Sequence, residues 1–384
     1  MFSKKALKEL LEATSRYPGG LMVLEENKPK LVILDYQTYQ KMTLGKIETA
    51  VQKVGEGKSV LVTGGAGYIG SHTGKLLVEL GFKVTTLDNL STGKKEFAAG
   101  KFVEGDLADE QFLDDLFAQE KFDAVVHFAA SIEVEESVKD PGAYYQNNVV
   151  NGLNLLRAMS KHKVSNLVFS STCVVYDEKA ESPIAETAAL GPTSPYGETK
   201  LVFENMLKWF GAAYGLSSVS LRYFNAAGAS FDQTLGYTGE SPTHLIPSAL
   251  NVALGKKESM MVYGNDYATQ DGTTMRDFIH VMDLAEAHVL ALRRMFTKSG
   301  MAIGEAYNIG TGRGYSVLEI INAICERTGH MVKFEIGPRR SGDREQVVAD
   351  AAKAKKDLGF EPKYSDLNTI IDTAWAWHKK YFAR

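Results

Sequence analysis

Tyr196 and Lys200 are the residues of this sequence whose types and spacing best suit proton chemistry. They stand four residues apart in SPYGETK, so a helix beginning there places both side chains on one face. Tyrosine has a reference pKa of about 10, and service as a base near neutrality requires a decrease of about 3, or about 4 kcal/mol. One cation about 4 Å away at an effective dielectric of about 20 supplies roughly that energy. The pair therefore predicts a phenolate that removes a proton from a substrate hydroxyl.

A glycine-rich turn, GGAGYIG at 64–70, joins a strand pattern at 60–63 to a helical pattern. Glycines let the backbone turn tightly and approach a pyrophosphate, which then lies at the positive end of the following helix. The next strand pattern ends at Asp88, where a carboxylate accepts hydrogen bonds from adenosine ribose hydroxyls and repels a 2′-phosphate. The sequence therefore predicts NAD rather than NADP. Because Asn89 and Ser91 are typical turn residues, a loop-capping role for Asp88 stays open.

The nicotinamide of NAD adds a second positive charge, which together with Lys200 favours ionised Tyr196 while hydride leaves the substrate. Ser170, Ser171 and Thr172 follow another strand pattern, at the edge of the sheet where ligands bind. We select Thr172 to hydrogen-bond the reacting oxygen and complete a Thr–Tyr–Lys set. Local capping by these hydroxyls is the alternative.

Two further strand ends are expected to line the cofactor cleft. Asp106 closes one strand, and the segment Phe128-Ala129-Ala130 closes the next. A strand-end turn for Asp106 and core packing for Phe128 remain open as alternatives.

The elements that position these residues follow an α/β rhythm, in which buried-strand runs alternate with helical stretches. The strand runs lie at 60–63, 84–87, 124–128, 166–170 and 218–222. Beyond about residue 225 the rhythm is irregular, with helical segments at 283–295, 316–328 and 366–380. We predict a Rossmann-like doubly wound parallel sheet, a smaller α/β substrate-binding lobe and a small N-terminal α+β extension. The predicted domains are 1–57 (extension, a helix and a hairpin), 58–225 (NAD-binding) and 226–384 (mainly substrate-binding).

Composition excludes several classes of protein. The 384 residues carry 43 basic and 47 acidic side chains, a net charge of −4, so no basic field predicts binding to nucleic acid or a membrane surface. Cys173 and Cys325 have no neighbouring ligands at metal spacing, which argues against a metal site or a disulfide framework and favours the cytoplasm. No signal peptide and no run of about 18 apolar residues is present, so we expect a soluble protein.

From Lys58 to about Arg384 the chain resembles the UDP-glucose 4-epimerases (UDP-galactose 4-epimerases) of the extended short-chain dehydrogenase/reductase superfamily. The resemblance rests on VTGGAGYIGSH, TLDNL, HFAAS, YYQNNV, VFSST, SPYGETK, LRYFNAAGA, THLIP, DGTTMRDFIHVMDLA, YNIGTG and PRRSGD. It implies tightly held NAD, oxidation of the sugar C4 hydroxyl to a transient 4-ketone, rotation of that ketone, and return of hydride to its other face. It also implies a homodimer.

The resemblance assigns roles residue by residue, with Tyr196 as the base, Lys200 as its electrostatic partner and Thr172 as the assisting hydroxyl. The implied NAD contacts are Gly64, Gly67, Tyr68, Ile69, Gly70, Asp88, Asn89, Ser91, Asp106, Leu107, Phe128, Ala129, Ala130, Asn147, Tyr196, Lys200 and Tyr223. The implied UDP-sugar contacts are Thr172, Tyr196, Asn225, His244, Leu245, Arg276, Arg340, Asp343 and Val347. Arginine's planar fork suits phosphate oxygens, and Asp343 suits ribose hydroxyls.

Three features depart from the family pattern or vary within it. Asp177 stands where the family usually has glycine, beside the loop that follows Thr172. Val347 is small at a position of variable bulk, and we hypothesise that it admits N-acetylated UDP-hexosamines. Residues 1–57 faintly resemble antitoxins of the prevent-host-death type, and we hypothesise a dimer-assembly or partner-docking element there.

Several other functions have residue requirements that can be compared with this sequence. A nucleotide-sugar 4,6-dehydratase needs an acidic pair where this chain has Cys173 and Val174. A ketone reductase does not need both Arg276 and Arg340. Epimerases of UDP-uronates or UDP-pentoses stay open. From a different class, a non-enzymatic NAD sensor or scaffold would need only the glycine loop.

Overall fold

The computed structural model describes residues 21–25, 28–33, 55–239, 242–297, 304–340 and 342–382. The chain forms two compact units, Met1–Glu56 and Gly57–Arg384. In the first unit β1 (Leu21–Glu25) and β2 (Lys28–Ile33) pair antiparallel, in agreement with the predicted hairpin. The helix predicted before residue 18 lies outside the described residues.

A seven-stranded sheet with the order β12-β8-β7-β6-β3-β4-β5 forms the centre of the second unit, and every pairing in it is parallel. The strands are β3 (Ser59–Thr63), β4 (Lys83–Asp88), β5 (Lys101–Glu104), β6 (Ala124–His127), β7 (Asn166–Thr172), β8 (Ser217–Tyr223) and β12 (Gly304–Ile309). The strand order reverses between β3 and β6, which opens a crevice at the carboxyl ends of the strands. The predicted Rossmann-like sheet is confirmed.

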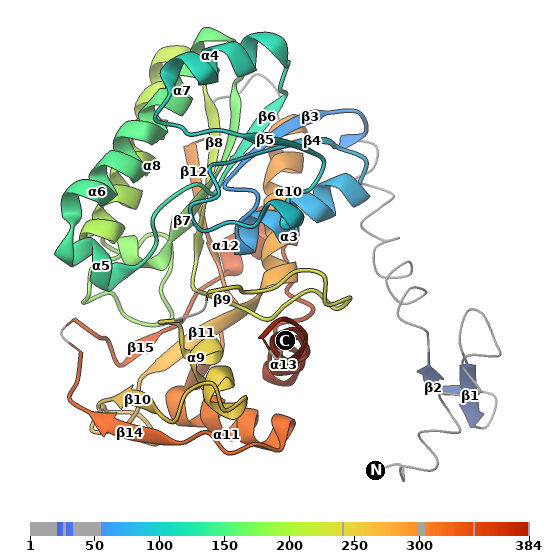
Figure 1. Cartoon of the computed structure of the whole chain (residues 1–384), viewed down its shortest axis with the longest axis vertical. Coiled ribbons are helices and arrows are strands. Elements are labelled where there is room, and N and C mark those ends of the chain that lie inside the picture. Colours follow the sequence, from blue (N-terminus) through green and yellow to red (C-terminus); the bar gives the residue numbers. More distant parts are fainter. Residues whose placement is uncertain are drawn as a thin grey trace. The chain divides into compact units, whose positions relative to one another are not determined.

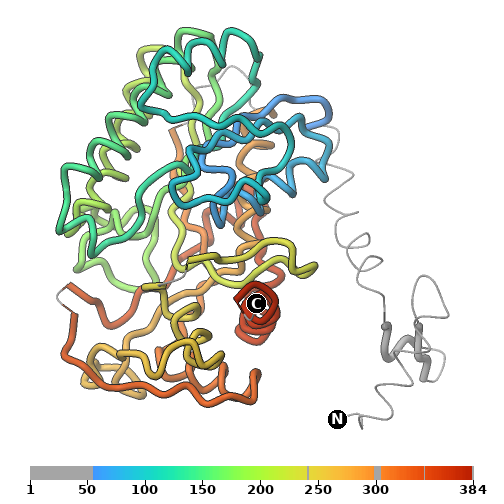
Figure 2. Tube along the Cα trace, viewed as in Figure 1, coloured from blue at the N-terminus to red at the C-terminus, as the bar shows by residue number. Residues whose placement is uncertain are grey.

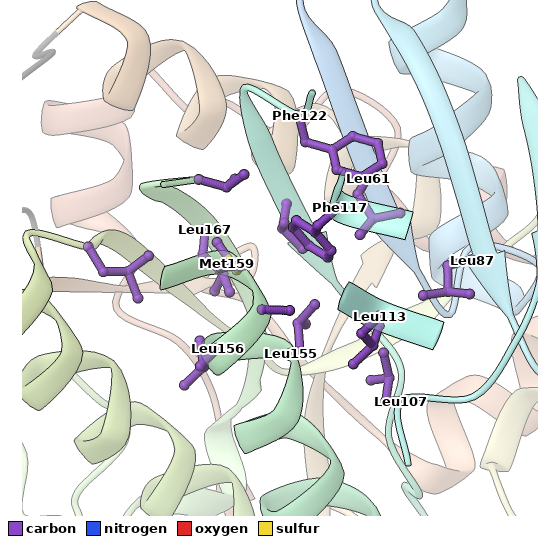
Figure 3. Close-up of a cluster of buried hydrophobic side chains, with 14 of the residues drawn as sticks. Leu61, Leu87, Leu107, Leu113, Phe117, Phe122, Leu155, Leu156, Met159 and Leu167 are labelled. Atoms are coloured by element: carbon purple, nitrogen blue, oxygen red, sulfur yellow. The ribbon is translucent and has the colours of Figure 1, made fainter. Parts of the chain in front are cut away.

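Helices cover both faces of this sheet (Figure 1). One face carries α3 (Tyr68–Glu79) and α10 (Val281–Thr297), and the other carries α4 (Glu110–Gln119), α7 (Asn151–Lys161) and α8 (Pro195–Tyr214). Leucine and phenylalanine side chains fill the space between strands and helices on the second face (Figure 3). The labelled members are Leu61, Leu87, Leu107, Leu113, Phe117, Phe122, Leu155, Leu156, Met159 and Leu167. This packing fixes the strand ends that build the crevice.

A smaller lobe follows β8 and combines two small sheets with three helices. A four-stranded sheet contains β9 (Asn225–Ala227), β11 (Met275–His280), β13 (Gly314–Ser316) and β15 (Gln346–Val347). A two-stranded sheet contains β10 (Met260–Tyr263) and β14 (Phe334–Gly337). The helices are α9 (Leu245–Ala253), α11 (Val317–Thr328) and α13 (Leu367–Phe382), and their apolar faces share one core. The helical segments predicted from about residue 316 and 366 correspond to α11 and α13.

The helix predicted at 283–295 is present as α10, but it packs on the central sheet instead of in the smaller lobe. Strand β12 and the short helix α12 (Ala352–Leu358) also return to that sheet. Late segments of the chain, coloured orange in Figure 2, therefore occur both beside the sheet and in the smaller lobe. Among the described residues no helix is both long and apolar enough to cross a membrane.

Candidate active site

The glycine turn between β3 and α3 leaves no room for a side chain at Gly64 or Gly70. Gly64 has a φ of +69°, and a Cβ there would lie 2.6 Å from the backbone nitrogen of Ala129. A Cβ on Gly70 would lie 2.3 Å from the carbonyl oxygen of Gly64. The N-cap residue of α3 is Gly67, which has no side chain to cap the helix, and the first turn contains no acidic residue. The free N–H groups and the positive helix end can therefore receive a pyrophosphate, which is the fit that NAD requires.

Asp88 ends β4 and has the capping role that the sequence left open. Its Oδ1 accepts the Leu90 N–H at 2.8 Å, and its Oδ2 accepts the Ala66 N–H of the glycine turn at 3.0 Å. Each carboxylate oxygen keeps a second lone pair, so these bonds orient the group without preventing it from binding ribose hydroxyls. Asn89 donates to Asp106 at 2.8 Å, which brings two more of the predicted contacts together.

Thr172, Tyr196 and Lys200 meet at the carboxyl edge of the sheet. Thr172 is the last residue of β7, not a loop residue after it, and its Oγ1 accepts the Val174 N–H at 3.2 Å. Helix α8 begins with Pro195, so Tyr196 and Lys200 lie in its first two turns as the four-residue spacing predicts. Lys200 is 2% exposed, and its Nζ donates to the Ser170 carbonyl oxygen at 2.8 Å.

The protein alone does not make Tyr196 a base at neutral pH. Burial raises the pKa of Tyr196 to about 12, against a hydrogen bond with Thr172 that lowers it. Burial also lowers the pKa of Lys200 to about 7. A pKa of about 7 leaves Lys200 only partly charged at neutrality, so it favours the Tyr196 phenolate less than a full unit charge would. A second positive charge is therefore required, as the sequence argument for NAD supposes.

Other predicted cofactor residues surround this pair. Phe128 and Ala129 follow β6, and their N–H groups both donate to the Thr63 carbonyl beside the glycine turn. Asn147 lies in the π-helical turn Gln146–Val150 and donates to the Ser131 hydroxyl at 3.1 Å. Tyr223 ends β8 directly beside Thr172 in the strand register. The crevice therefore brings these residues to one edge, as expected for a doubly wound sheet.

Arg276, Asp343 and Val347 lie together in the smaller lobe. Arg276 Nη2 donates to Asp343 Oδ1 at 2.6 Å, and Arg276 pairs in register with Val347 between β11 and β15. The charge of Arg276 acts on the Cys173 thiol, so this group adjoins the Thr172 end of β7. Asn225 is joined to the same strand by a bond from its Nδ2 to the Asp277 carbonyl at 3.1 Å. One edge of the lobe thus brings together Arg276, Asp343, Val347 and Asn225, four of the residues predicted to contact the UDP-sugar.

Arg340 contacts different residues from those that Arg276 contacts. Its guanidinium stacks 4.0 Å above the Tyr263 ring and approaches Glu135 at 3.3 Å. His244 is the N-cap residue of α9, with Leu245 as the first helical residue. Neither arginine is a solvated charge without partners.

Several residues that shape the site were not predicted. Glu133 accepts a bond from the Thr243 hydroxyl at 2.6 Å, which links the segment after β6 to the lobe. The Asp277 carboxylate accepts N–H groups of Thr311, Gly312 and Ala349 and thereby holds the loops around β11. These contacts join distant segments, and no local sequence pattern signals them.

A buried network behind Thr172 was also missed. Glu204 accepts from both Arg222 and the Ser171 hydroxyl, and Arg222 donates to the Tyr176 oxygen. One local signal was available, because Glu204 lies four residues after Lys200 on the buried side of α8.

Asp177, the departure from the family pattern, belongs to the turn after β7. Its Oδ1 accepts the Lys179 N–H at 2.8 Å, and its carbonyl accepts Arg344 Nη1 at 3.2 Å. The residue caps its own loop and ties that loop to the smaller lobe. In the described part of the chain, no group of three His, Cys, Asp or Glu side chains is arranged to hold a metal ion.

Comparison with known proteins agrees with this geometry. Residues 60–310 match the model of the NAD dependent epimerase/dehydratase family. The UDP-glucose 4-epimerase of Halalkalibacterium halodurans is 48% identical over 324 residues, which cover 84% of this chain and 96% of that one.

Solved structures of similar proteins share the fold. The UDP-glucose 4-epimerase from Brucella ovis in complex with NAD is 48% identical, has a TM-score of 0.80 and covers 83% of this chain and 98% of its own. The UDP-Glc/GlcNAc 4-epimerase from Campylobacter jejuni is 42% identical, has a TM-score of 0.74 and covers 84% of this chain and 100% of its own. Both matches span the central sheet and the smaller lobe together.

Proposed function

The chain belongs to the UDP-glucose 4-epimerases of the NAD dependent epimerase/dehydratase family, and from that premise we propose how its own residues invert C4 of a UDP-hexose. It is an NAD-dependent isomerase that interconverts UDP-glucose and UDP-galactose through a transient 4-keto sugar. The observation that carries the proposal is the meeting of Thr172, Tyr196 and Lys200 beside the glycine turn.

NAD, when bound, supplies the acceptor and donor of the C4 hydride. The glycine turn and the N-terminus of α3 would hold the pyrophosphate, and Asp88 would hold the adenosine ribose. Phe128, Asn147 and Tyr223 would lie near the other end of the cofactor.

Tyr196 removes the proton of the sugar C4 hydroxyl and later returns one to the same oxygen. Its position in the first turn of α8 favours the ionised form, since the N-terminal end of a helix carries a partial positive charge. Lys200 stabilises that phenolate without touching the sugar, because its Nζ is held by the Ser170 carbonyl. Before substrate binds, Thr172 hydrogen-bonds Tyr196 and keeps the two hydroxyls together. With the sugar in place, its one hydroxyl proton is donated to the reacting oxygen.

Arg276 and Arg340 would clamp the diphosphate from two directions. Asp343, now bound to Arg276, has a second carboxylate oxygen available for ribose hydroxyls. Asn225, His244 and Leu245 would complete the nucleotide side of the site. This clamp keeps the nucleotide bound while the sugar ring presents first one face and then the other.

Proton NMR of UDP-galactose with purified protein tests the proposal, with no reductant added. Formation of UDP-glucose supports it. If UDP-galactose stays unchanged while a UDP-uronate or UDP-pentose is inverted, the substrate class is different. If none of them reacts, the chain is an NAD-binding sensor or scaffold.

We expect the enzyme to accept N-acetylated UDP-hexosamines, and Val347→Tyr to remove that activity. Val347 shares a face with Arg276 and packs with Cys173 next to Thr172, so bulk at this position narrows the space beside the sugar. The variant should lose at least tenfold in kcat/KM for UDP-N-acetylglucosamine and less than threefold for UDP-glucose. Val347→Ile is the control. Equal losses for both sugars would contradict the assignment.

The proposed homodimer interface is the helical side formed by α5 (Val134–Lys139), α6 (Pro141–Tyr145), the π-helical turn and α8. These elements contact one another and lie on one side of the sheet (Figure 1). They carry large apolar side chains that are exposed to solvent when the chain is alone. Those residues are Val138 (62%), Tyr145 (39%), Val150 (44%) and Trp209 (75%). Such a patch is typical of a surface that a second copy buries.

Sedimentation is expected to give twice the chain mass of 42.1 kDa. Trp209→Glu should shift the protein toward monomer, because it places a charge at the most exposed of these apolar residues. Met331→Glu, at a 79% exposed residue of the smaller lobe, should leave the dimer intact. A monomeric wild type would contradict this interface.

The proposed division of the chain is 1–57, 58–225 and 226–384, with the first segment acting in dimer assembly or partner docking. Deletion of residues 1–57 with no change in oligomeric state or activity would remove that role. The proposed compartment is the cytoplasm, since Cys173 and Cys325 are both free thiols. Cell fractionation tests the location.

A further inference from the structure

His288 lies behind the proposed active site, and none of the roles above uses it. It is fully buried on α10, which packs on β7 and β8. Its Nδ1 lies 2.8 Å from the Leu284 carbonyl oxygen, and its Nε2 lies 3.0 Å from the Tyr223 hydroxyl. Its ring centroid is 4.7 Å from that of Phe128. The side chain therefore contacts two residues that are expected to face the cofactor.

The partners of His288 determine where its proton lies. A carbonyl oxygen only accepts, so Nδ1 must carry hydrogen. Burial lowers the pKa of His288 to about 4, so the ring is neutral at pH 7 and Nε2 has no hydrogen. Nε2 is consequently an acceptor, and the Tyr223 hydroxyl must donate to it.

Ser170 connects Tyr223 to the catalytic pair. The Ser170 hydroxyl hydrogen-bonds the Tyr223 oxygen, whose own proton is already directed to His288, so Ser170 is the donor. The Ser170 carbonyl in turn accepts from Lys200 at 2.8 Å. Lys200, Ser170, Tyr223 and His288 thus form one series of contacts that ends at the Leu284 carbonyl. Along the series, the Ser170 and Tyr223 hydroxyls each donate toward His288.

His378 offers a natural contrast. It also lies on a helix, is 2% exposed, and places Nδ1 2.9 Å from the carbonyl four residues earlier. Its Nε2 has no hydrogen-bond partner among the described residues. The local geometry of a buried helix histidine therefore does not by itself require a partner at Nε2, and the Tyr223 contact is particular to His288.

We propose that His288 is a positioning residue, whose bare Nε2 holds the Tyr223 proton away from Tyr196 and so keeps the Tyr196 oxygen free for the sugar hydroxyl. The inference rests on the proposed function of Tyr196. Without an acceptor at position 288, the buried Tyr223 hydroxyl must turn to another partner. Tyr223 lies beside Thr172 in the strand register, and Thr172 hydrogen-bonds Tyr196, so Tyr196 is a neighbour toward which that hydroxyl can turn. A Tyr196 oxygen that accepts from Tyr223 is a weaker base.

His288→Phe is the first test, with His288→Gln as rescue and His378→Phe as the matched control. We expect His288→Phe to lower kcat for UDP-galactose about tenfold and to change KM less than twofold, because the nucleotide ligands are untouched. The acid limb of its pH–rate profile should move to lower pH by about one unit, since a hydrogen bond to the phenolate stabilises it. His288→Gln, whose side-chain carbonyl can accept, should recover most of kcat. His378→Phe should lose stability only.

A second measurement needs no turnover and is made on the protein with NAD bound. Nitrogen-15 NMR of the wild type is expected to show His288 with hydrogen on Nδ1 and none on Nε2. Carbon-13 labels at tyrosine Cζ should show a lower pKa for Tyr196 in His288→Phe than in the wild type or His378→Phe. Hydrogen on Nε2, or an unchanged Tyr196 pKa together with unchanged kcat, would overturn the proposal. If the wild type does not turn over at all, the proposed function fails, and the two NMR results still decide the hydrogen-bond direction.

Discussion

Tyr196→Phe is expected to lower kcat for C4 inversion about a thousandfold. Removal of a positioned acid–base group costs about 10²- to 10⁴-fold, and no neighbour is placed to replace this one. The Thr172 hydroxyl is a far weaker base, and the Lys200 ammonium is directed to the Ser170 carbonyl. The variant should keep its fold, since Phe retains the ring that packs in the first turn of α8.

The measurement is proton NMR of UDP-galactose conversion, with bound NAD quantified after denaturation of each sample. NAD content should match the wild type, because the glycine turn and Asp88 are unchanged. Thr172→Val is a useful companion, with an expected loss of about tenfold to a hundredfold, because the hydroxyl assists without accepting the proton. Retention of more than a tenth of wild-type kcat in Tyr196→Phe would show that another group is the base.

The sequence predicts the placement of Tyr196 and Lys200 well because both belong to successive turns of one helix. Four-residue spacing puts Tyr196 and Lys200 on the same face whatever surrounds them. The glycine turn is predictable for a similar reason, since strand, glycines and helix are contiguous. Parallel topology then brings Thr172 and Phe128 to the same edge, because successive strands of a doubly wound sheet end there.

The groups that set the properties of the pair come from distant segments, and local patterns do not reveal them. His288 acts from α10, a helix that the sequence rhythm assigned to the other lobe. Asp277 holds three backbone groups from two separate loops. Such partners depend on which helix covers which face of the sheet, and that is decided by the packing of the whole unit.

The pKa values of Tyr196 and Lys200 also depend on packing that the sequence pattern does not reveal. Spacing alone suggests a fully charged Lys200 beside Tyr196, whereas burial lowers the pKa of Lys200 to about 7 and its Nζ is bound to the Ser170 carbonyl. Burial, which no spacing argument includes, raises the pKa of Tyr196 to about 12. The chain thus builds a site whose base is inactive until further positive charge arrives.

Glu204→Ala is expected to cause the largest loss of stability, about 3–5 kcal/mol in the free energy of unfolding, because it leaves a buried charge without its partner. The Glu204 and Arg222 side chains are only 3% and 4% exposed. Burial alone would lower the pKa of Arg222, but its bonds to Glu204 hold that pKa above its usual range. Without Glu204 the guanidinium keeps its charge and loses two hydrogen bonds, at 2.9 Å and 2.6 Å. Denaturant unfolding measures the loss.

Two controls separate pairing from mere truncation. Asp372→Ala breaks the ion pair between Arg327 and Asp372, whose side chains are 43% and 45% exposed, respectively. This change should lower the free energy of unfolding by less than about 1 kcal/mol. Glu204→Leu combined with Arg222→Met removes both charges and should recover much of the stability, since apolar replacement of a buried pair is often neutral. Ser171 loses its acceptor in that double variant as well. A double variant as unstable as Glu204→Ala would instead mean that Glu204 acts mainly through Ser171 and the end of β7.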